Sequence, residues 1–163
     1  MNNFSVRRAY KHDLVEISRI YSTAREFMRK TGNPLQWTNG YPQLEILCED
    51  IDKGRLYLVE SQERVVGAFV FFIGEEPIYN RIEAGEWKSK NGCGVLHRVA
   101  SDGSEKGVFG AVYKFVKERS SEIRIDTHAD NFVMQKTLAK YGFERAGIVY
   151  LSDGAERIAF ESI

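Results

Sequence analysis

The hydrophobic positions of this chain follow two periods, one typical of helices and the other of strands. Residues 14–28 carry apolar side chains at helical spacing, which predicts a helix that begins after Asp13. The sequence TGNP at residues 31–34 ends this helix. A second helix is expected over residues 42–54, with Pro42 in its first turn and a glycine at its end. The first third of the chain therefore predicts two consecutive helices.

Segments typical of strands precede and follow these two helices. Apolar runs of strand length lie at residues 4–9, 55–61, 64–74, 93–100, 122–128 and 145–162, the last as a hairpin. Further helices are expected at residues 105–119 and from Asp130 or Asn131 onward. Residues 75–92 show no clean period and are interpreted as a surface excursion with a short helix. The order β-α-α-β-β-β-α-β-α-β-β predicts one α/β (α+β) domain over residues 1–163, built around a central sheet.

The composition limits the classes of function. Lys+Arg and Asp+Glu each number 23, and the resulting formal charge of zero argues against nucleic acid as the main partner. The first residues lack the continuous apolar segment of a signal peptide, and the run VVGAFVFFIG has the length of a strand, not of a membrane span. Cys48 and Cys93 lie outside any spacing typical of a metal site. These features predict a cytoplasmic protein with no metal, nucleic acid or membrane as partner.

The segment SDGSEKGVFG, residues 101–110, joins a predicted strand to a predicted helix. A helix start presents unpaired backbone N–H groups and the positive end of the macrodipole, and glycine lets an anion approach that backbone closely. Lys106 adds a positive charge beside it. The spacing of Gly103, Gly107 and Gly110 fits neither a P-loop nor a dinucleotide fingerprint. The segment therefore predicts a pyrophosphate cradle of another kind.

This segment and the later sequence RIDTHADNFVMQKTLAKYGFERAGI together resemble the GNAT acetyltransferase superfamily, which uses acetyl-CoA. The family's turn Q/R-x-x-G-x-G/A is similar to residues 104–109, and its element N-x-x-A…G-F is similar to Asn131 and Gly142-Phe143. The resemblance covers nearly the whole chain. It implies a central mixed, mostly antiparallel sheet that splays between strands 4 and 5 and is flanked by about four helices.

The resemblance also implies the contacts with acetyl-CoA or coenzyme A. The pantetheine arm is expected along the fourth strand, the pyrophosphate on the following loop, and further contacts on the last helix: His97, Arg98, Val99, Glu105, Lys106, Gly107, Val108, Phe109, Gly110, Asn131, Met134 and Leu138. Four positions depart from the family. Ser104 replaces Gln or Arg, Phe109 a small residue, Met134 alanine, and Leu138 the tyrosine that serves as general acid toward the CoA thiolate. That acid role is therefore not transferred to this chain.

Acetyl transfer to an amine needs a neutral amine and stabilisation of the negative charge that develops on the carbonyl oxygen. The resemblance implies that the backbone N–H of Val99 provides this stabilisation. Candidate bases are His97, whose ordinary pKa lies near neutrality, His128, and the carboxylates of Glu83, Glu86 and Asp126. Each candidate also has a structural interpretation. His97 would pack within the sheet, and Asp126 and His128 would lie on an ordinary polar strand face. Glu83 and Glu86 would lie on a solvated loop.

The acceptor site is expected at the turn between the first two helices, where Trp37 and Tyr41 lie, with Trp87 and His128 as further candidates. Core packing is the alternative for the aromatic side chains.

We expect an N-acetyltransferase that acts on a small-molecule or peptide amine, as a monomer or homodimer. The alternatives are a CoA-binding sensor or structural domain without activity, and an acyltransferase with another acyl-CoA or a protein acceptor. A cleft lined with carboxylates would favour a peptide or polyamine, and a closed aromatic pocket a small molecule.

Overall fold

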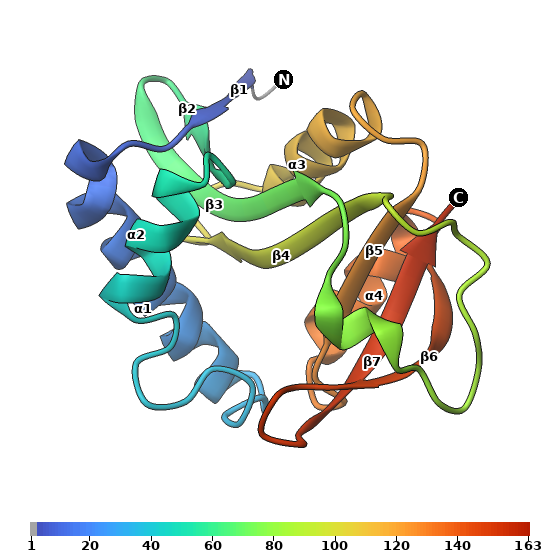
Figure 1. Ribbon diagram of the computed structural model, residues 1–163. Coiled ribbons are helices and arrows are strands. Elements are labelled where there is room, and N and C mark those ends of the chain that lie inside the picture. Colours follow the sequence, from blue (N-terminus) through green and yellow to red (C-terminus); the bar gives the residue numbers. More distant parts are fainter. Residues whose placement is uncertain (1–2) are drawn as a thin grey trace. The chain divides into compact units, whose positions relative to one another are not determined.

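The computed structural model describes residues 3–163, and its order of helices and strands is the order that the sequence predicts. The strands are β1 (Phe4–Arg8), β2 (Leu56–Ser61), β3 (Arg64–Ile73), β4 (Gly94–Ser101), β5 (Ile123–Thr127), β6 (Glu144–Tyr150) and β7 (Glu156–Ser162). The helices are α1 (Leu14–Lys30), α2 (Leu44–Asp52), α3 (Val108–Lys117) and α4 (Phe132–Lys140), with short 3-10 turns at Lys11–Asp13 and Pro77–Asn80. Figure 1 shows the path of the chain through these elements.

The strands are ordered β1-β2-β3-β4-β5-β7-β6 in a mixed sheet. β1 with β2, β2 with β3, β5 with β7 and β6 with β7 are antiparallel, whereas β4 and β5 are parallel. The parallel pairing covers two residue pairs, Gly94 with Ile123 and Val95 with Arg124. The mixed, mostly antiparallel sheet with four helices confirms the predicted fold class.

The chain forms two compact units. Residues up to Phe71 and the segment His97–Phe115 make the first unit, and Phe72–Leu96 with Val116–Ile163 make the second. Strand β4 contributes to both, because its first three residues belong to the second unit and the rest to the first. The expectation of a single domain over residues 1–163 stays a prediction.

In the first unit, both faces of β3 are covered. Seven consecutive residues, Val65–Phe71, are buried, which a strand with one solvated face does not show. Phe69 and Phe71 point to one face by strand alternation, and their rings contact Phe115 of α3 at 5.6 and 6.5 Å between centroids. Figure 1 shows α1 and α2 on the opposite face of β3. Apolar residues on both faces thus fix the sheet between two layers of helices.

In the second unit, a core cluster lies where β4, β6 and β7 meet the segment after β3. Its buried members are Tyr79, Val95, Ala146, Val149 and Ala159, and Trp87 packs against them partly buried. The sequence predicts residues 75–92 as a surface excursion with a short helix. The short turn at Pro77–Asn80 confirms the helix, but Tyr79 is only 3% exposed, so this segment contributes to the core.

Two helix starts differ from the sequence prediction. Pro42 precedes Gln43, the N-cap of α2, so the prediction that it occupies the first helical turn is wrong. The third helix begins at Val108 and not at residue 105. The positive φ of Gly107, +94°, is incompatible with a helix that continues through it, so the preceding residues form a loop.

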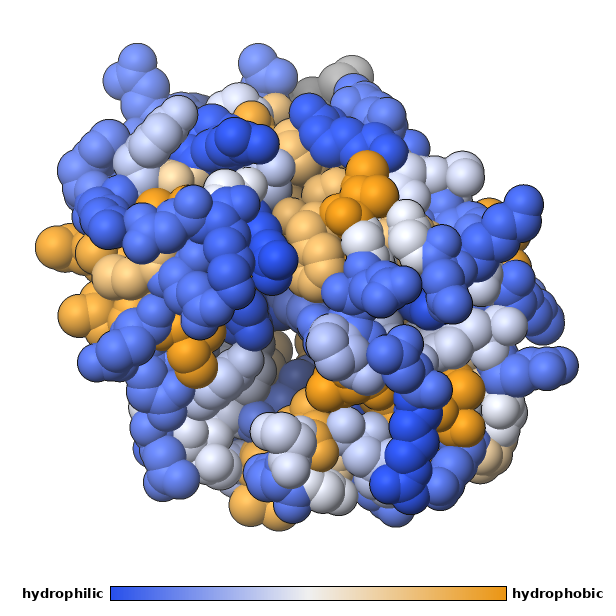
Figure 2. Space-filling model, viewed as in Figure 1, coloured by the Kyte–Doolittle hydropathy of each residue, from blue (hydrophilic) through white to orange (hydrophobic). Residues whose placement is uncertain are grey.

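Hydrophilic side chains cover most of the face drawn in Figure 2, and hydrophobic ones form smaller groups among them. Exposed large apolar residues are spread over different elements, for example Val15 in α1, Ile73 in β3 and Phe132 in α4. Scattered residues of this kind are normal on a protein surface. None of the helices between residues 3 and 163 combines the length and the apolar character that a membrane span requires.

The backbone of residues 83–85 packs directly on β6. Glu83 and Ile148 exchange two backbone hydrogen bonds of 2.9 and 2.7 Å, so this segment pairs with the strand at the end of the sheet order. A Cβ on Gly147 would lie 2.6 Å from the carbonyl oxygen of Glu83, and one on Gly85 would lie 1.9 Å from that of Ala146. The two glycines therefore permit this close approach.

We expect Gly147→Ala to destabilise the protein by about 1–3 kcal/mol, the usual cost of overpacking. The added methyl group would push the Glu83 carbonyl away from β6 and weaken the backbone pairing with Ile148. Urea unfolding followed by circular dichroism measures the effect. An unchanged or higher unfolding free energy would contradict the packing described here, because alanine in an ordinary strand position is otherwise more favourable than glycine.

Candidate functional site

The loop that follows β4 is held by the carboxylate of Asp102. Its Oδ1 accepts hydrogen bonds from the backbone N–H of Ser104, at 3.0 Å, and from the Ser104 hydroxyl. Its Oδ2 accepts from Arg19 of α1 at 3.0 Å and from Arg64 of β3 at 3.3 Å. The Asp102 backbone N–H donates to the carbonyl of Val66. One buried carboxylate therefore connects the loop to both α1 and β3.

Burial acts to raise the pKa of Asp102, but its hydrogen bonds with Ser104 and Arg19 outweigh this effect and hold the pKa below its ordinary value. The carboxylate is thus ionised at neutral pH. An ionised acceptor strengthens all of its hydrogen bonds, which favours a single conformation of the loop.

The loop ends at Gly107, whose carbonyl accepts the hydrogen bond of Ala111 at 3.2 Å and so begins α3. Gly107 has φ +94°, a conformation that residues with a Cβ rarely adopt. The N–H groups of the first helical turn and the dipole of α3 then favour an anion at this end. Lys106 is exposed beside it, whereas the carboxylate of Glu105 accepts a hydrogen bond from Ser61 of β2. These features fit a pyrophosphate on the predicted loop, although Val108, Phe109 and Gly110 belong to the helix.

The start of α3 lies directly on β3 because residue 67 is glycine. A Cβ on Gly67 would lie 2.7 Å from Cγ1 of Val108 and 3.0 Å from the carbonyl oxygen of Ala100. Val108 is only 4% exposed, so its side chain occupies the space that a larger residue 67 would fill. The sequence placed Gly67 in a strand but gave no sign of this contact.

Strand β4 contains a residue in an unusual conformation. Arg98 has φ +49°, the left-handed region that is uncommon for any residue except glycine. Its guanidinium makes a bidentate ion pair with Asp50 of α2, with Nη2 at 2.7 Å from Oδ2 and 2.9 Å from Oδ1, and donates through Nη1 to the Tyr41 hydroxyl. The Tyr21 hydroxyl of α1 donates to the Arg98 carbonyl at 2.8 Å.

The two aromatic residues predicted for the acceptor site contribute to the same cluster. Trp37 lies at 5.6 Å from Tyr21 and 6.3 Å from Tyr41, measured between ring centroids. The structure therefore brings Trp37, Tyr41 and Arg98 together, and adds Asp50 and Tyr21, which the sequence analysis missed. The sequence does contain a signal for Asp50. It follows Leu47 by three positions, so both side chains lie on the same, buried face of α2.

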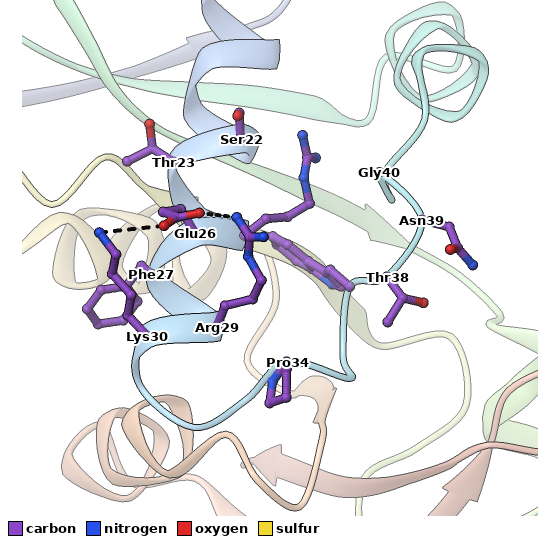
Figure 3. Close-up of a pocket in the computed structure, with 12 residues that line it drawn as sticks. Ser22, Thr23, Glu26, Phe27, Arg29, Lys30, Pro34, Thr38, Asn39 and Gly40 are labelled. Carbon is purple, nitrogen blue, oxygen red and sulfur yellow. Dashed lines mark hydrogen bonds and ion pairs between the residues drawn. The ribbon is translucent and has the colours of Figure 1, made fainter.

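A groove of about 780 Å³ lies between the C-terminal half of α1 and the loop that follows it. Its lining includes three cationic side chains, Arg25, Arg29 and Lys30, one carboxylate, Glu26, and the ring of Trp37. Figure 3 shows Arg29 and Lys30 reaching Glu26 from opposite sides. The groove is open and carries more positive than negative charge. It is neither the carboxylate-lined cleft nor the closed aromatic pocket considered from the sequence.

The second unit holds two of the predicted catalytic carboxylates. Asp126 of β5 accepts a hydrogen bond of 2.7 Å from the Tyr79 hydroxyl, and burial raises the pKa of Tyr79 so that it remains a donor. Glu83 is exposed and accepts from Tyr150 at 2.6 Å and from Arg81. These hydrogen bonds, first from Tyr150 and then from Arg81, lower the pKa of Glu83. A lower pKa makes a carboxylate a weaker base.

The other candidates of the second unit have structural contacts. Trp87 donates from Nε1 to the Tyr79 carbonyl at 3.0 Å, and the guanidinium of Arg124 lies over its ring at 4.4 Å. Nδ1 of His128 accepts from the backbone N–H of Asp130. Glu86 is exposed, whereas His97, in the first unit, is half-buried on β4. Their functional roles stay predictions.

Helix α4 begins as the sequence predicts. Asn131 is its N-cap, and the side-chain oxygen accepts from the backbone N–H of Met134 at 3.0 Å. Met134 is half-buried, and Leu138 is fully buried. The cap explains why asparagine is favoured at position 131, and burial explains why position 138 accepts an apolar residue. Contacts of the three residues with a cofactor stay predictions.

Solved structures with similar folds include two bacterial acetyltransferases. A GNAT-family acetyltransferase from Streptococcus agalactiae is 27% identical, with a TM-score of 0.88 over 98% of this chain and 95% of its own. A putative acetyltransferase from Staphylococcus aureus is 28% identical, with a TM-score of 0.69 over 96% and 97%. N-acetylglutamate synthase from Neisseria gonorrhoeae, solved with coenzyme A and N-acetyl-glutamate, shares the fold at 13% identity and a TM-score of 0.64, over 99% of this chain and 35% of its own. Comparisons with protein-family models and with curated protein sequences find no match.

We expect Asp102→Asn to reduce the unfolding free energy at pH 7 by about 1–3 kcal/mol, because Arg19 and Arg64 lose an ionised partner. The folded-state pKa of Asp102 is lowered, so its stabilising effect is complete above the unfolded pKa of about 3.9 and is lost as the pH falls through the folded pKa. The difference between wild type and variant should therefore shrink below about pH 4.

Urea unfolding at pH 7, 5 and 3.5 measures this difference. Asp153→Asn, in the turn between β6 and β7, is a suitable control because its carboxylate accepts the backbone N–H of Ala155 in a similar turn. At pH 7 the control should cost less stability than Asp102→Asn, because Asp153 accepts a backbone N–H whereas Asp102 also accepts from Arg19 and Arg64. A destabilisation by Asp102→Asn that is equal at all three pH values would show that the ionised carboxylate does not hold the loop.

Proposed function

Because this chain has the fold of the GNAT acetyltransferase superfamily, we propose that it is an N-acetyltransferase that moves an acetyl group from acetyl-CoA to a primary amine. The observation that carries the proposal is the loop at residues 101–107 and its junction with α3, which combine a fixed backbone, a left-handed glycine and a helix start. Two acetyltransferases at 27% and 28% identity, similar over nearly their whole length, support the same reaction class.

In this proposal the cofactor's pyrophosphate binds the N–H groups at the start of α3, with Lys106 beside it and Gly107 leaving room for close approach. His97, Arg98 and Val99 of β4 lie along the arm of the cofactor. The family resemblance adds Asn131, Met134 and Leu138 as contacts. Bound acetyl-CoA supplies a thioester, whose acetyl group is the one transferred.

The protein's own groups have two tasks in this reaction. The backbone N–H of Val99 stabilises negative charge on the acetyl carbonyl oxygen, and a base removes the proton of the amine. His97 is the proposed base in the first unit, because a neutral imidazole can accept a proton from an ammonium group. Leu138 has no proton to donate, so the protein supplies no acid at this position; a leaving thiol with a pKa near that of cysteine would not require one.

The groove along α1 is the proposed acceptor site. It contains Trp37 and lies next to Tyr41, which accepts a hydrogen bond from Arg98, so this surface is connected to β4 within the first unit.

The second candidate function is that of a CoA-binding domain without transferase activity. Leu138 favours it, because a fully buried leucine at the position of the family's acid removes one catalytic group.

Coenzyme A should stabilise the protein, by about 2.7 kcal/mol at a hundredfold excess over Kd. Gly107→Val should abolish most of this stabilisation, because a Cβ and two methyl groups would occupy the approach to the helix start. Valine at φ +94° also strains the backbone, so the variant is less stable without ligand. Thermal melts with and without millimolar CoA separate the two effects.

Gly154→Val is the matched control, because Gly154 has φ +87° in a hairpin turn and no atom lies within 4 Å of its Cβ position. It should lose stability and keep the full shift with CoA. A wild-type melt that does not move with CoA would contradict the proposed function, and an equal shift in both variants would remove this loop from the binding site.

The excess of positive charge in the groove predicts that acidic amines are better acceptors than polyamines. We expect kcat/KM for an amine with a carboxylate, such as glutamate, to exceed that for spermidine by about tenfold, which corresponds to roughly 1.4 kcal/mol. Release of free CoA thiol is the measurement. Arg25→Gln should reduce the difference, whereas Lys136→Gln, on the exposed surface of α4, should not. A higher kcat/KM for spermidine than for glutamate would contradict the groove as the acceptor site.

A further inference from the structure

Arg98 and Asp50 form an ion pair that is almost removed from solvent. Their side chains are 18% and 6% exposed. Burying two charges removes them from water, and a buried ion pair is often no more stabilising than two apolar side chains of similar size. Nothing in the proposed chemistry uses the charge of Asp50. Global stability alone therefore does not explain why the pair is present.

All three guanidinium nitrogens of Arg98 donate hydrogen bonds within the protein. Nε donates to Asp50 at 3.1 Å, Nη2 donates to both oxygens of the same carboxylate, and Nη1 donates to the Tyr41 hydroxyl. Each nitrogen thus donates either to Asp50 of α2 or to Tyr41 in the turn before it. These contacts favour a role for the backbone of Arg98 over a role for its charge in ligand binding.

The same residue is held at its carbonyl group. The Tyr21 hydroxyl donates to the Arg98 carbonyl oxygen at 2.8 Å, and Tyr21 is fully buried in α1. The side chain is therefore held by α2 and the carbonyl by α1, at a residue with a left-handed backbone, φ +49°. A residue with a Cβ persists in such a conformation only where its surroundings hold it there.

A left-handed residue within a strand turns the peptide bond that follows it out of the regular ladder, as in a β-bulge. The peptide after Arg98 carries the N–H of Val99, which is the proposed donor to the acetyl carbonyl oxygen. We propose that Arg98 is a positioning residue: its ion pair with Asp50 and the hydroxyls of Tyr21 and Tyr41 hold the left-handed turn and thereby aim the Val99 N–H. This inference rests on the proposed function.

The test uses two double variants that differ only in residue 98. Arg98→Met/Asp50→Leu replaces the ion pair with apolar side chains of similar size, so that no unpaired charge is buried. Arg98→Gly/Asp50→Leu makes the same change at position 50 but leaves residue 98 free to adopt a positive φ. We expect kcat to fall at least tenfold in the methionine variant and to recover at least threefold in the glycine variant. Because β4 is also proposed to contact the cofactor, the Kd for CoA is measured beside kcat, and the loss of CoA affinity should be smaller than the loss of kcat in the methionine variant.

Tyr21→Phe tests the second anchor, because it removes the hydroxyl and keeps the ring against Trp37. We expect a severalfold loss of kcat with unchanged KM for the acceptor. A second readout needs no turnover: in protein labelled with 15N-valine, the Val99 amide resonance should move in Tyr21→Phe, which leaves the sequence around Val99 unchanged. Tyr57→Phe, whose ring packs against Phe69 and Phe115, is the control for loss of a tyrosine hydroxyl in this unit.

Wild-type kcat in the methionine variant, or a Val99 resonance that stays in place in Tyr21→Phe, would overturn the inference and leave Arg98 a packing residue. Failure of the proposed function gives a different result. In that case the wild-type protein neither binds CoA nor releases thiol, while a shifted Val99 resonance still shows that the anchors of Arg98 set this peptide.

Discussion

The Arg98–Asp50 ion pair is the interaction on which the arrangement of the first unit depends. A buried charge requires a partner, so the position of α2, which carries Asp50, is fixed relative to β4, which carries Arg98. The Tyr41 hydroxyl adds the turn before α2 to the same guanidinium, and Trp37 packs on Tyr41. The proposed acceptor groove and the unusual backbone of β4 are therefore connected by contacts to one side chain.

Two buried carboxylates of this unit differ in what they do for stability. The pKa of Asp102 is lowered because Ser104 and Arg19 outweigh the effect of burial, so its ionised form stabilises the folded state. Burial raises the pKa of Asp50, whereas the pKa of Arg98 is raised despite its burial because Tyr41 and Asp50 favour its charge. Within the pair, burial thus disfavours the charge of one partner while the contacts favour the charge of the other. Asp102 holds its loop, and Asp50 holds the guanidinium of Arg98, which agrees with a positioning role.

The sequence predicted the elements well because their signals are local. Apolar spacing in residues 14–28 defines α1 within one segment, and the N-cap at Asn131 is visible from the residue type at a helix start. The site was predicted less well because its contacts are not local. Arg98 and Asp50 are separated by 48 residues, and no spacing within either segment indicates that they meet. The contact of Gly67 with Val108 was missed for the same reason, since it depends on two segments that approach only in the folded unit.

Helix α1 is the common support of all three parts of the proposed site that lie in the first unit. Arg19 binds the carboxylate that shapes the anion loop, and Tyr21 binds the carbonyl of the left-handed residue in β4. Seven of the residues between Ser22 and Lys30 line the groove. A displacement of this helix would move the loop, the strand and the groove together. The apolar face of α1, with Ile17 and Ile20 fully buried, therefore does more than stabilise the unit, because it sets the relative positions of the groups proposed to bind the cofactor and the amine.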